Sequence, residues 1–395
     1  MLAGLLLAAW YGQVVIVIVL GLVLSAAGLS KLWSRYSLKG VHCEHLLSEK
    51  RAFPGEYLEL KLQLVNRKIL PLPWIQVDDE MPARFIQGVS LPPGNRPGYG
   101  LFSKATALLW YTRVSWQQRL YCDKRGYYTL GPITLTSGDI FGFYPRSVTE
   151  PQPEHVIVYP KIYPIAQLGI PSLYPLGDTT AERRIFEDPT RVIGVRDYSP
   201  HDSLRHIHWK ATARHQNLEV KVFEPTTTLK LALFMAIDSF KSDSMYHEDE
   251  LELAISTAAS VANYAIEQGS LVGLFVNTCL ADSRESARIA PGSGVNQLVC
   301  ILEALAKVTV LHSRPFEEFL QGETSNLPWG TTLVFLFSRP SEHLVGLLTD
   351  LRDKGHRILA LQIGHQPKVD IASAIIWHNV RNPEDMMRLV SGEGL

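Results

Sequence analysis

The first thirty residues of this chain form one long apolar run that contains no Asp, Glu, Lys or Arg. Spanning the hydrocarbon core of a bilayer takes about 20 apolar residues in a helix, and residues 5–29 provide that length. Lys31 and Arg35 follow at once, and this positive bias predicts that the remaining chain lies in the cytoplasm. A cleaved signal peptide is the alternative, but it has a basic segment before a shorter apolar core of about 7–15 residues. We therefore expect one retained span in the inner (cytoplasmic) membrane, with the bulk of the chain cytoplasmic.

Charge and cysteine content narrow the function classes. The chain has 38 Lys and Arg against 39 Asp and Glu, so no net field favours nucleic acid, and we expect no nucleic-acid partner. The four cysteines include no C-x-x-C pair, which argues against a zinc module and a disulfide framework; they are Cys43, Cys122, Cys279 and Cys300. Free cysteines fit a reducing compartment, in agreement with the predicted topology.

Residues 41–150 have the pattern of a β domain. Tyr57–Leu64 alternates strictly between leucine and polar side chains, which is the period of a half-buried strand. Proline- and glycine-rich turns separate further short strands, and such spacing indicates a small antiparallel β-sandwich. We expect these strands at 75–77, 107–115, 119–122, 126–130 and 133–136.

Residues 151–228 form a connector that is rich in proline and charge. Two strands are expected in it, at 156–159 and 218–223. Between them, residues 202–214 are expected to form a short helix with Asp202 or Ser203 as its N-cap.

The chain changes character at residue 229, where apolar strands begin to alternate with helical patterns. This alternation predicts a mostly parallel α/β sheet with helices on both faces. Together with the N-terminal transmembrane helix (1–40), the sandwich (41–150) and the connector, this α/β domain (229–395) completes the expected organisation. Strands are predicted at 229–237, 271–276, 332–337, 357–363 and 374–377, and helices at 250–267, 296–307, 341–354 and after Asn382–Pro383.

The loop after the first α/β strand carries a candidate metal site. Asp238 ends that strand, and Ser242 follows four residues later. This resembles the metal-ion-dependent adhesion site of the von Willebrand factor A fold, Asp-x-Ser-x-Ser, whose oxygen ligands suit Mg²⁺. Phe240 stands at the third position and cannot ligate, and Lys241 places a cation beside the loop. The alternative is that Asp238 only caps the next turn, and we expect no bound cofactor.

A second candidate site interleaves opposite charges with large aromatic side chains. One interpretation is a docking surface or anion site, because the arginines present rigid forks that bind carboxylates. The other, which we favour, is an interdomain clasp in which Trp209 is buried against a neighbouring sheet. The residues of this segment are Arg196, Tyr198, Asp202, Arg205, Trp209, Lys210 and Arg214.

Four histidines cluster in the same segment, at His201, His206, His208 and His215. On a strand, His206 and His208 share a face and suit a transition metal such as zinc. On the helix expected here they point about 200° apart. The sequence contains no H-E-x-x-H, no G-x-x-x-x-G-K-[ST] and no G-x-S-x-G, so no complete catalytic motif is present.

The charged segment also resembles the signature of domain-of-unknown-function family 58, R-x-Y-x-x-G-D followed by R-x-I-x-W-K and A-R. Every signature position from Arg196 to Arg214 matches in order except His201, where glycine is usual. Residues 53–56, 72–75, 124–128 and 138–142 agree with the same family. The resemblance implies a membrane-anchored β-sandwich with a von Willebrand factor A-like domain, without an established catalytic activity. It also implies a partner, since such proteins are often encoded beside MoxR-type AAA+ ATPases.

The sequence therefore predicts a non-enzymatic, membrane-anchored scaffold or adaptor. Its A-like domain presents the loops around Asp238, 292–295 and Ser338 to protein partners, among them a MoxR-type AAA+ ATPase. One alternative is a metal-dependent hydrolase that uses the histidine cluster or the Asp238 loop. Another is an extracellular adhesion module, which requires the opposite membrane topology.

Overall fold

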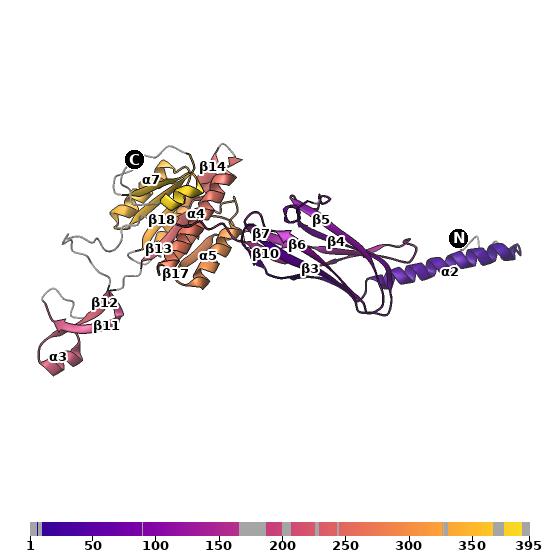
Figure 1. Cartoon of the computed structure of the whole chain (residues 1–395), viewed down its shortest axis with the longest axis horizontal. Coiled ribbons are helices and arrows are strands. Elements are labelled where there is room, and N and C mark those ends of the chain that lie inside the picture. Colours follow the sequence, from indigo (N-terminus) through magenta and orange to yellow (C-terminus); the bar gives the residue numbers. More distant parts are fainter. Residues whose placement is uncertain are drawn as a thin grey trace. The chain divides into compact units, whose positions relative to one another are not determined.

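The computed structural model describes residues 6, 10–88, 90–165, 187–199, 207–225, 229–242, 245–325, 327, 331–365 and 375–388. The chain divides into two compact units (Figure 1). Unit 1 comprises Met1–Ile162 with Thr278–Ala287 and Val299–Ser313, and unit 2 comprises Tyr163–Asn277, Arg288–Leu298 and Arg314–Leu395. Each unit is described by itself below.

Unit 1 begins with helix α2 (Val14–Ser37), which is apolar and exposed along most of its length. Among the described residues it is the one helix long and apolar enough to cross a membrane, in line with the expected span. The helix continues beyond Leu29, and its last turns change character, because Ser30, Ser34 and Ser37 are buried against the rest of the unit. The identity of the membrane and the orientation of the chain stay predictions.

The β region of unit 1 is an antiparallel sandwich, as expected. One layer is β1 (Val41–Leu47), β3 (Tyr57–Asn66) and β6 (Arg113–Tyr121). The other layer is β5 (Tyr99–Leu108), β4 (Leu72–Pro82), β8 (Ile133–Ser137) and β9 (Arg146–Glu150). The leucines of β3 pack between the layers, with Leu62 and Leu64 against Ile75 and Val77 of β4. A third sheet contains β2 (Arg51–Ala52), β10 (Glu154–Val158) and β7 (Gly126–Leu130).

The strand predicted at 107–115 is wrong. β5 ends at Leu108 and β6 begins at Arg113, so a reversal lies where a continuous strand was expected. Tyr111 has a positive φ of 51°, which a strand does not accommodate. The Thr112 hydroxyl donates to the Leu109 carbonyl at 2.8 Å and closes the turn. The apolar residues 107–110 concealed this turn, because it lacks the glycine or proline that usually mark one.

Unit 2 contains a six-stranded sheet in the order β17-β16-β13-β18-β19-β20. From β16 to β20, neighbouring strands of this sheet are all parallel. Numbered by sequence this is the order 3-2-1-4-5-6 of doubly wound sheets. The strands are β13 (Lys230–Met235), β16 (Leu271–Val276), β17 (Ala287–Gly292), β18 (Thr332–Phe337), β19 (Ile358–Ile363) and β20 (Ile376–Val380).

Helices cover this sheet. On one face, α6 (Phe316–Thr324) and α7 (Glu342–Asp353) pack against Phe234, Phe335 and the other apolar side chains of alternate strand positions. α4 (Glu248–Glu267) contacts β13, β16, β18 and β19 through its own buried stripe. Because alternate residues of β13 are buried as well, both faces of the strand are covered. Helix α5 (Val295–Lys307) follows β17, and a 3₁₀ helix, η4 (Pro383–Arg388), follows β20.

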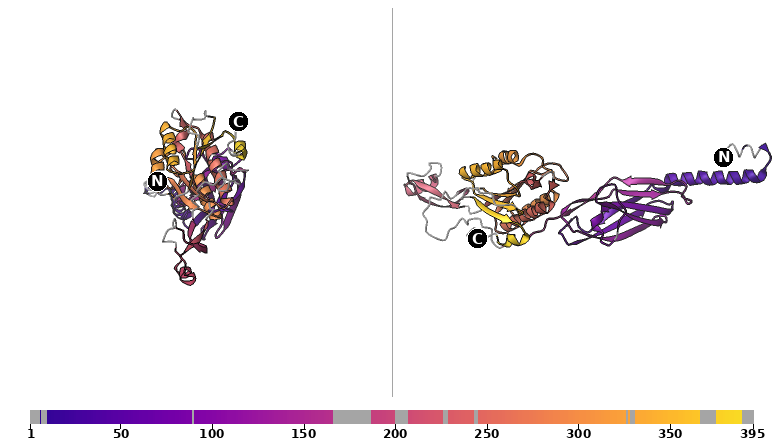
Figure 2. Two further views of the ribbon diagram at one scale, coloured as in Figure 1. Left: turned by 90° about the vertical axis from the view of Figure 1, so that its left-hand side faces the viewer. Right: turned by 90° about the horizontal axis from the view of Figure 1, so that it is seen from above.

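The connector contributes a small module of two strands and a short helix. Strands β11 (Glu187–Asp197) and β12 (Glu219–Pro225) pair antiparallel, and α3 (Trp209–His215) lies between them in the sequence (Figure 2). We call β11, α3 and β12 the signature module. Two further short pieces, η3 (Ile237–Phe240) and the β14–β15 hairpin (Lys241–Ser242, Met245–Tyr246), follow β13.

Candidate functional site

The strand order of unit 2 reverses between β13 and β18, and in doubly wound sheets ligands bind outside the carboxyl ends of the strands at such a point. The chain that leaves β13 forms η3, which carries Asp238 and Ser239. The chain that leaves β18 carries Ser338 and Arg339. The predicted residue Asp238 therefore lies at the expected edge of the sheet.

The carboxylate of Asp238 is occupied by protein hydrogen bonds. Oδ2 accepts from the Phe316 amide at 2.8 Å, and Oδ1 accepts from Asn277 Nδ2 at 3.2 Å. Asn277 is itself fixed, since its Oδ1 accepts from the Ile237 amide at 2.8 Å and its Nδ2 donates to the Arg314 carbonyl. Phe316 is the first residue of α6, so Asp238 caps a helix that begins 78 positions later in the chain.

Ser239, Ser338 and Glu250 form a second polar network at this edge, and of the three only Ser338 lies in a loop that the sequence predicted as part of the site. The Ser239 hydroxyl donates to the Ala236 carbonyl at 2.6 Å and accepts from the Ser338 amide at 3.1 Å. The Ser338 hydroxyl donates to Glu250 Oε2 at 2.7 Å. A Cβ on Gly364 would stand 2.6 Å from Glu250 Oε1, so a side chain at this position would have to displace the carboxylate.

The metal hypothesis gains no ligand set from this geometry. Among the residues that the structure describes, no three His, Cys, Asp or Glu side chains come together in a way that could hold a metal. Both carboxylate oxygens of Asp238 already accept hydrogen bonds, from the Asn277 side chain and the Phe316 amide. The backbone of Ser242 belongs to β14. A Mg²⁺ site built on Asp238 and Ser242 stays a prediction.

The signature residues divide between described and undescribed parts of the chain. Arg196 lies on β11 opposite Val220 of β12, and the Tyr198 amide donates to the Leu218 carbonyl at 2.9 Å. Trp209, Lys210 and Arg214 lie on α3. The predicted residues Asp202 and Arg205, with His201 and His206, lie outside the described residues.

The helix expected at 202–214 begins later than predicted. Ile207 forms a β-bridge to Val220, and His208 is non-helical with a φ of −92° and a ψ of 81°. The cap of α3 is therefore His208, whose Nδ1 accepts from the Ala211 amide at 3.0 Å. The cap predicted at Asp202 or Ser203 is therefore wrong, because Ile207 pairs with Val220 of β12 immediately before the cap residue His208. The histidine spacing inferred from a continuous helix does not hold at His208.

The expected burial of Trp209 is also wrong. Its side chain is 69% exposed, and Lys210 and Arg214 beside it on α3 are exposed as well. The physical reason is that α3 is a helix of seven residues whose contacts run through its backbone and through Thr212, which accepts from the Glu219 amide at 3.0 Å. The signature module thus presents an exposed tryptophan and two exposed cations on one short helix.

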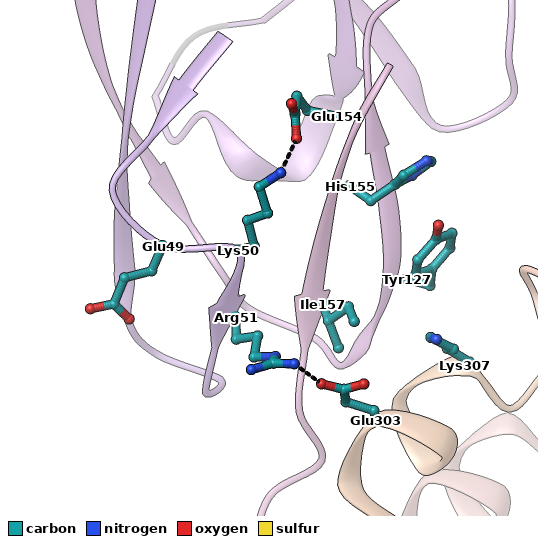
Figure 3. Close-up of a pocket in the computed structure, with 9 residues that line it drawn as sticks. All are labelled: Glu49, Lys50, Arg51, Tyr127, Glu154, His155, Ile157, Glu303 and Lys307. Carbon is teal, nitrogen blue, oxygen red and sulfur yellow. Dashed lines mark hydrogen bonds and ion pairs between the residues drawn. The ribbon is translucent and has the colours of Figure 1, made fainter. Parts of the chain in front are cut away.

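Unit 1 contains a pocket of about 690 Å³, which Figure 3 shows. Its three cations each have a carboxylate partner: Lys50 pairs with Glu154 at 2.7 Å, Arg51 with Glu303 at 2.5 Å and Lys307 with Asp282 at 2.7 Å. This balance leaves the pocket without a strong preference for an anion. It is lined by Glu49, Lys50, Arg51, Tyr127, Glu154, His155, Ile157, Glu303 and Lys307.

Comparisons with known proteins identify relatives for part of the chain. Residues 194–324 match the family described as "Protein of unknown function DUF58". The chain is 24% identical over 245 residues to "Uncharacterized protein YeaD" of Bacillus subtilis (strain 168), which covers 62% of this chain and 57% of that protein. The chain thus spans less than two thirds of that relative's length.

Solved structures resemble the chain only weakly. The alkylpurine DNA glycosylase AlkC of Pseudomonas fluorescens matches with a TM-score of 0.20 and 11% identity, over 30% of each chain. The sporulation control protein Spo0M of Bacillus subtilis matches with a TM-score of 0.19 and 12% identity, over 30% of this chain and 49% of that one. Such weak likenesses carry no argument about function. The family resemblance read from residues Arg196 to Arg214 is confirmed by the sequence matches, since residues 194–324 of the chain match the DUF58 family of proteins of unknown function.

Proposed function

We propose that this protein is a membrane-anchored, non-enzymatic adaptor that binds a cytoplasmic protein partner through the signature module. In this proposal α2 is a retained anchor in the inner membrane, and both folded units lie on the cytoplasmic side. Unit 2 serves as a von Willebrand factor A-like domain, which its parallel sheet and covering helices support. The candidate partner is a MoxR-type AAA+ ATPase.

The observation that carries the proposal is the exposure of Trp209 on α3. Tryptophan and arginine are the side chains most enriched among the residues that dominate binding energy at protein interfaces. Trp209 stands beside Lys210, and Arg214 lies one turn further along the same helix. Such a surface fits a partner that offers an apolar pocket rimmed by carboxylates.

The loops at the switch point are less suited to be the main contact surface. Asp238 and Ser239 direct their polar atoms to groups within unit 2, and so does Ser338. Breaking these hydrogen bonds to reach a partner would leave buried groups unsatisfied, which is costly. This cost favours α3 over the loops around Asp238 and Ser338 as the contact surface for a partner.

Co-purification of the chain in detergent with a MoxR-type AAA+ ATPase tests the proposal. We expect Trp209→Ala to abolish co-purification, because truncating such a residue removes the centre of the contact. Val295→Ala is the matched control, since Val295 is an apolar side chain of unit 2 with 75% exposure. Circular dichroism on each variant verifies that the fold is intact.

If the loops around Asp238 and Ser338 are the contact surface instead, the same assay should give the opposite result. If Trp209→Ala binds normally while the double variant Asp238→Asn/Ser242→Ala does not, the contact surface is formed by the loops at the switch point of unit 2. In that case the signature module has a structural role and the proposal about α3 is wrong.

A further inference from the structure

Three loops at one end of the sandwich expose large apolar side chains. They are residues 67–70, 109–112 and 139–144, and we call them the apolar rim. Phe141, Phe143 and Trp110 are 64%, 72% and 59% exposed. The rings of Phe141 and Phe143 stack at a centroid distance of 5.8 Å. The large apolar side chains of the rim are Ile69, Trp110, Tyr111, Ile140, Phe141 and Phe143.

The apolar rim surrounds the end of α2. The Ser34 hydroxyl donates to the Tyr144 carbonyl at 2.5 Å, and Lys68 Nζ donates to the Tyr36 carbonyl at 2.7 Å. The Lys68 carbonyl in turn accepts from the Tyr111 amide. Figure 1 shows α2 joining the sandwich at this end. The rim therefore lies level with the last two turns of the helix.

The part of α2 that lies outside the apolar rim is no longer than the hydrocarbon core of a bilayer. From Val14 to Leu29 the helix extends about 24 Å at about 1.5 Å per residue. The hydrocarbon core of a bilayer is about 30 Å thick, so this part of the helix is shorter than the core that it must cross. Ser30 is already buried against the sandwich at 6% exposure. A membrane that contains α2 must consequently reach the level of the rim.

We propose that the apolar rim inserts into the interfacial region of the bilayer that α2 crosses, so that the sandwich rests on the membrane. This inference relies on the membrane anchoring that is part of the proposed function. Aromatic side chains are enriched at the level of the lipid headgroups, and the rim places Trp110, Tyr111 and Phe143 there. Lys31 and Arg35 are exposed on the same turns of α2, where they meet anionic headgroups favourably.

The acidic residue of the rim does not oppose insertion. Asp139 is buried, and its carboxylate accepts from the Phe141 amide at 3.1 Å and from the Tyr144 amide at 2.8 Å. Its charge is therefore turned inward and serves to shape the loop that carries the two phenylalanines. The Trp74 indole donates to the Asp139 carbonyl at 3.0 Å and holds the same loop on the sandwich.

Site-specific fluorescence on the full chain in liposomes tests the inference. Phe143→Cys and the control Glu49→Cys are made in a Cys279→Ser/Cys300→Ser background, and each is labelled with an environment-sensitive dye. Cys43 and Cys122 are buried and stay unlabelled. Glu49 lies after the far end of β1, which starts beside α2 at Val41. In phosphatidylcholine liposomes with brominated acyl chains, we expect blue-shifted, quenched emission at position 143 and neither effect at position 49.

Flotation of the same liposomes distinguishes membrane anchoring of the chain from membrane insertion of the apolar rim. If the protein floats but the dye at position 143 is not quenched, the anchor is real and the rim inference is wrong; the rim then belongs to a protein partner. Equal quenching at positions 143 and 49 also contradicts insertion by the rim alone. If the protein does not float, the anchoring itself fails and the inference fails with it.

Discussion

Two ionisable side chains, His45 and Asp79, lie buried in the core of the sandwich. His45 Nε2 and Asp79 Oδ2 are 2.8 Å apart, and their side chains are 1% and 0% exposed. Burial raises the pKa of Asp79, while the hydrogen bond from His45 works in the opposite direction. The second carboxylate oxygen, Oδ1, has no hydrogen-bond partner within the described part of the chain. Asp79 therefore depends on His45 for its place in the core.

The first prediction concerns this pair. His45→Ala is expected to lower the free energy of unfolding by about 3–5 kcal/mol, because it strands a buried carboxylate. The matched control is His42→Ala on the same strand, whose pair with Glu150 at 3.7 Å is largely exposed on the histidine side, and a surface pair contributes about 0–1 kcal/mol. Urea unfolding of the full chain in detergent measures both. The double variant His45→Leu/Asp79→Leu should recover most of the lost free energy of unfolding, because it leaves no buried carboxylate. If it does not, the loss in His45→Ala does not come from the unpaired carboxylate of Asp79.

At the scale of elements, the start of α6 is set from outside the helix. Its first residue, Phe316, gives its amide to Asp238, and Pro315 before it provides no side-chain cap. An N-terminal amide satisfied by a carboxylate is also favoured by the helix dipole. The same contact joins the strand end of β13 to the helix that covers one face of its sheet.

We predict that Asp238→Ala lowers the free energy of unfolding by about 1–3 kcal/mol, since it leaves the Phe316 amide and Asn277 without their acceptor. Asp238→Asn should cost less, because its amide oxygen still accepts from Phe316. Thermal unfolding of the full chain compares the two variants. If instead added Mg²⁺ raises the unfolding temperature of the wild type and not of Asp238→Asn, the loop binds metal, and capping is not its main role.

The elements that sequence patterns predict well are those whose pattern is local. The apolar runs of β16 and β18 gave their bounds, 271–276 and 332–337, because strands buried on both faces are apolar throughout. α6 and β17 were missed. α6 has nine residues, and its start depends on Asp238, a contact that no local pattern records. β17 is an edge strand with only one buried residue, Ala287, so it lacks the alternation that marks a half-buried strand.

The candidate site was predictable only in part for the same reason. Asp238 was found because it follows a recognisable strand, although β13 ends at Met235 and Asp238 lies in η3. Ser239 and Glu250 were not, since their roles follow from the meeting of β13, β18 and α4, which lie far apart in the sequence. The burial of Trp209 was inferred from its apolar character, yet an interface residue and a core residue look alike in one sequence.

At the scale of the whole molecule, α2 and the two units place reactive groups where topology can be measured. Cys300 on α5 is exposed. Cys43 and Cys122 are buried, and burial is the main reason that their pKa values rise to about 12 and about 11. Buried thiols with such pKa values hold almost no thiolate at neutral pH, and the thiolate is the reactive form. Cys300 is consequently a better topology probe than Cys43.

We predict that a membrane-impermeant maleimide labels Cys300 only after spheroplasts are broken, because the positive side of α2 retains the folded units in the cytoplasm. The matched variant Leu2→Cys/Cys279→Ser/Cys300→Ser places a thiol before the predicted span of residues 5–29, and it should react in intact spheroplasts. Labelling is read by a mass shift of the purified chain. The reverse pattern, with Cys300 labelled in intact spheroplasts, would place both units outside the membrane and turn the adaptor proposal into one for an extracellular adhesion module.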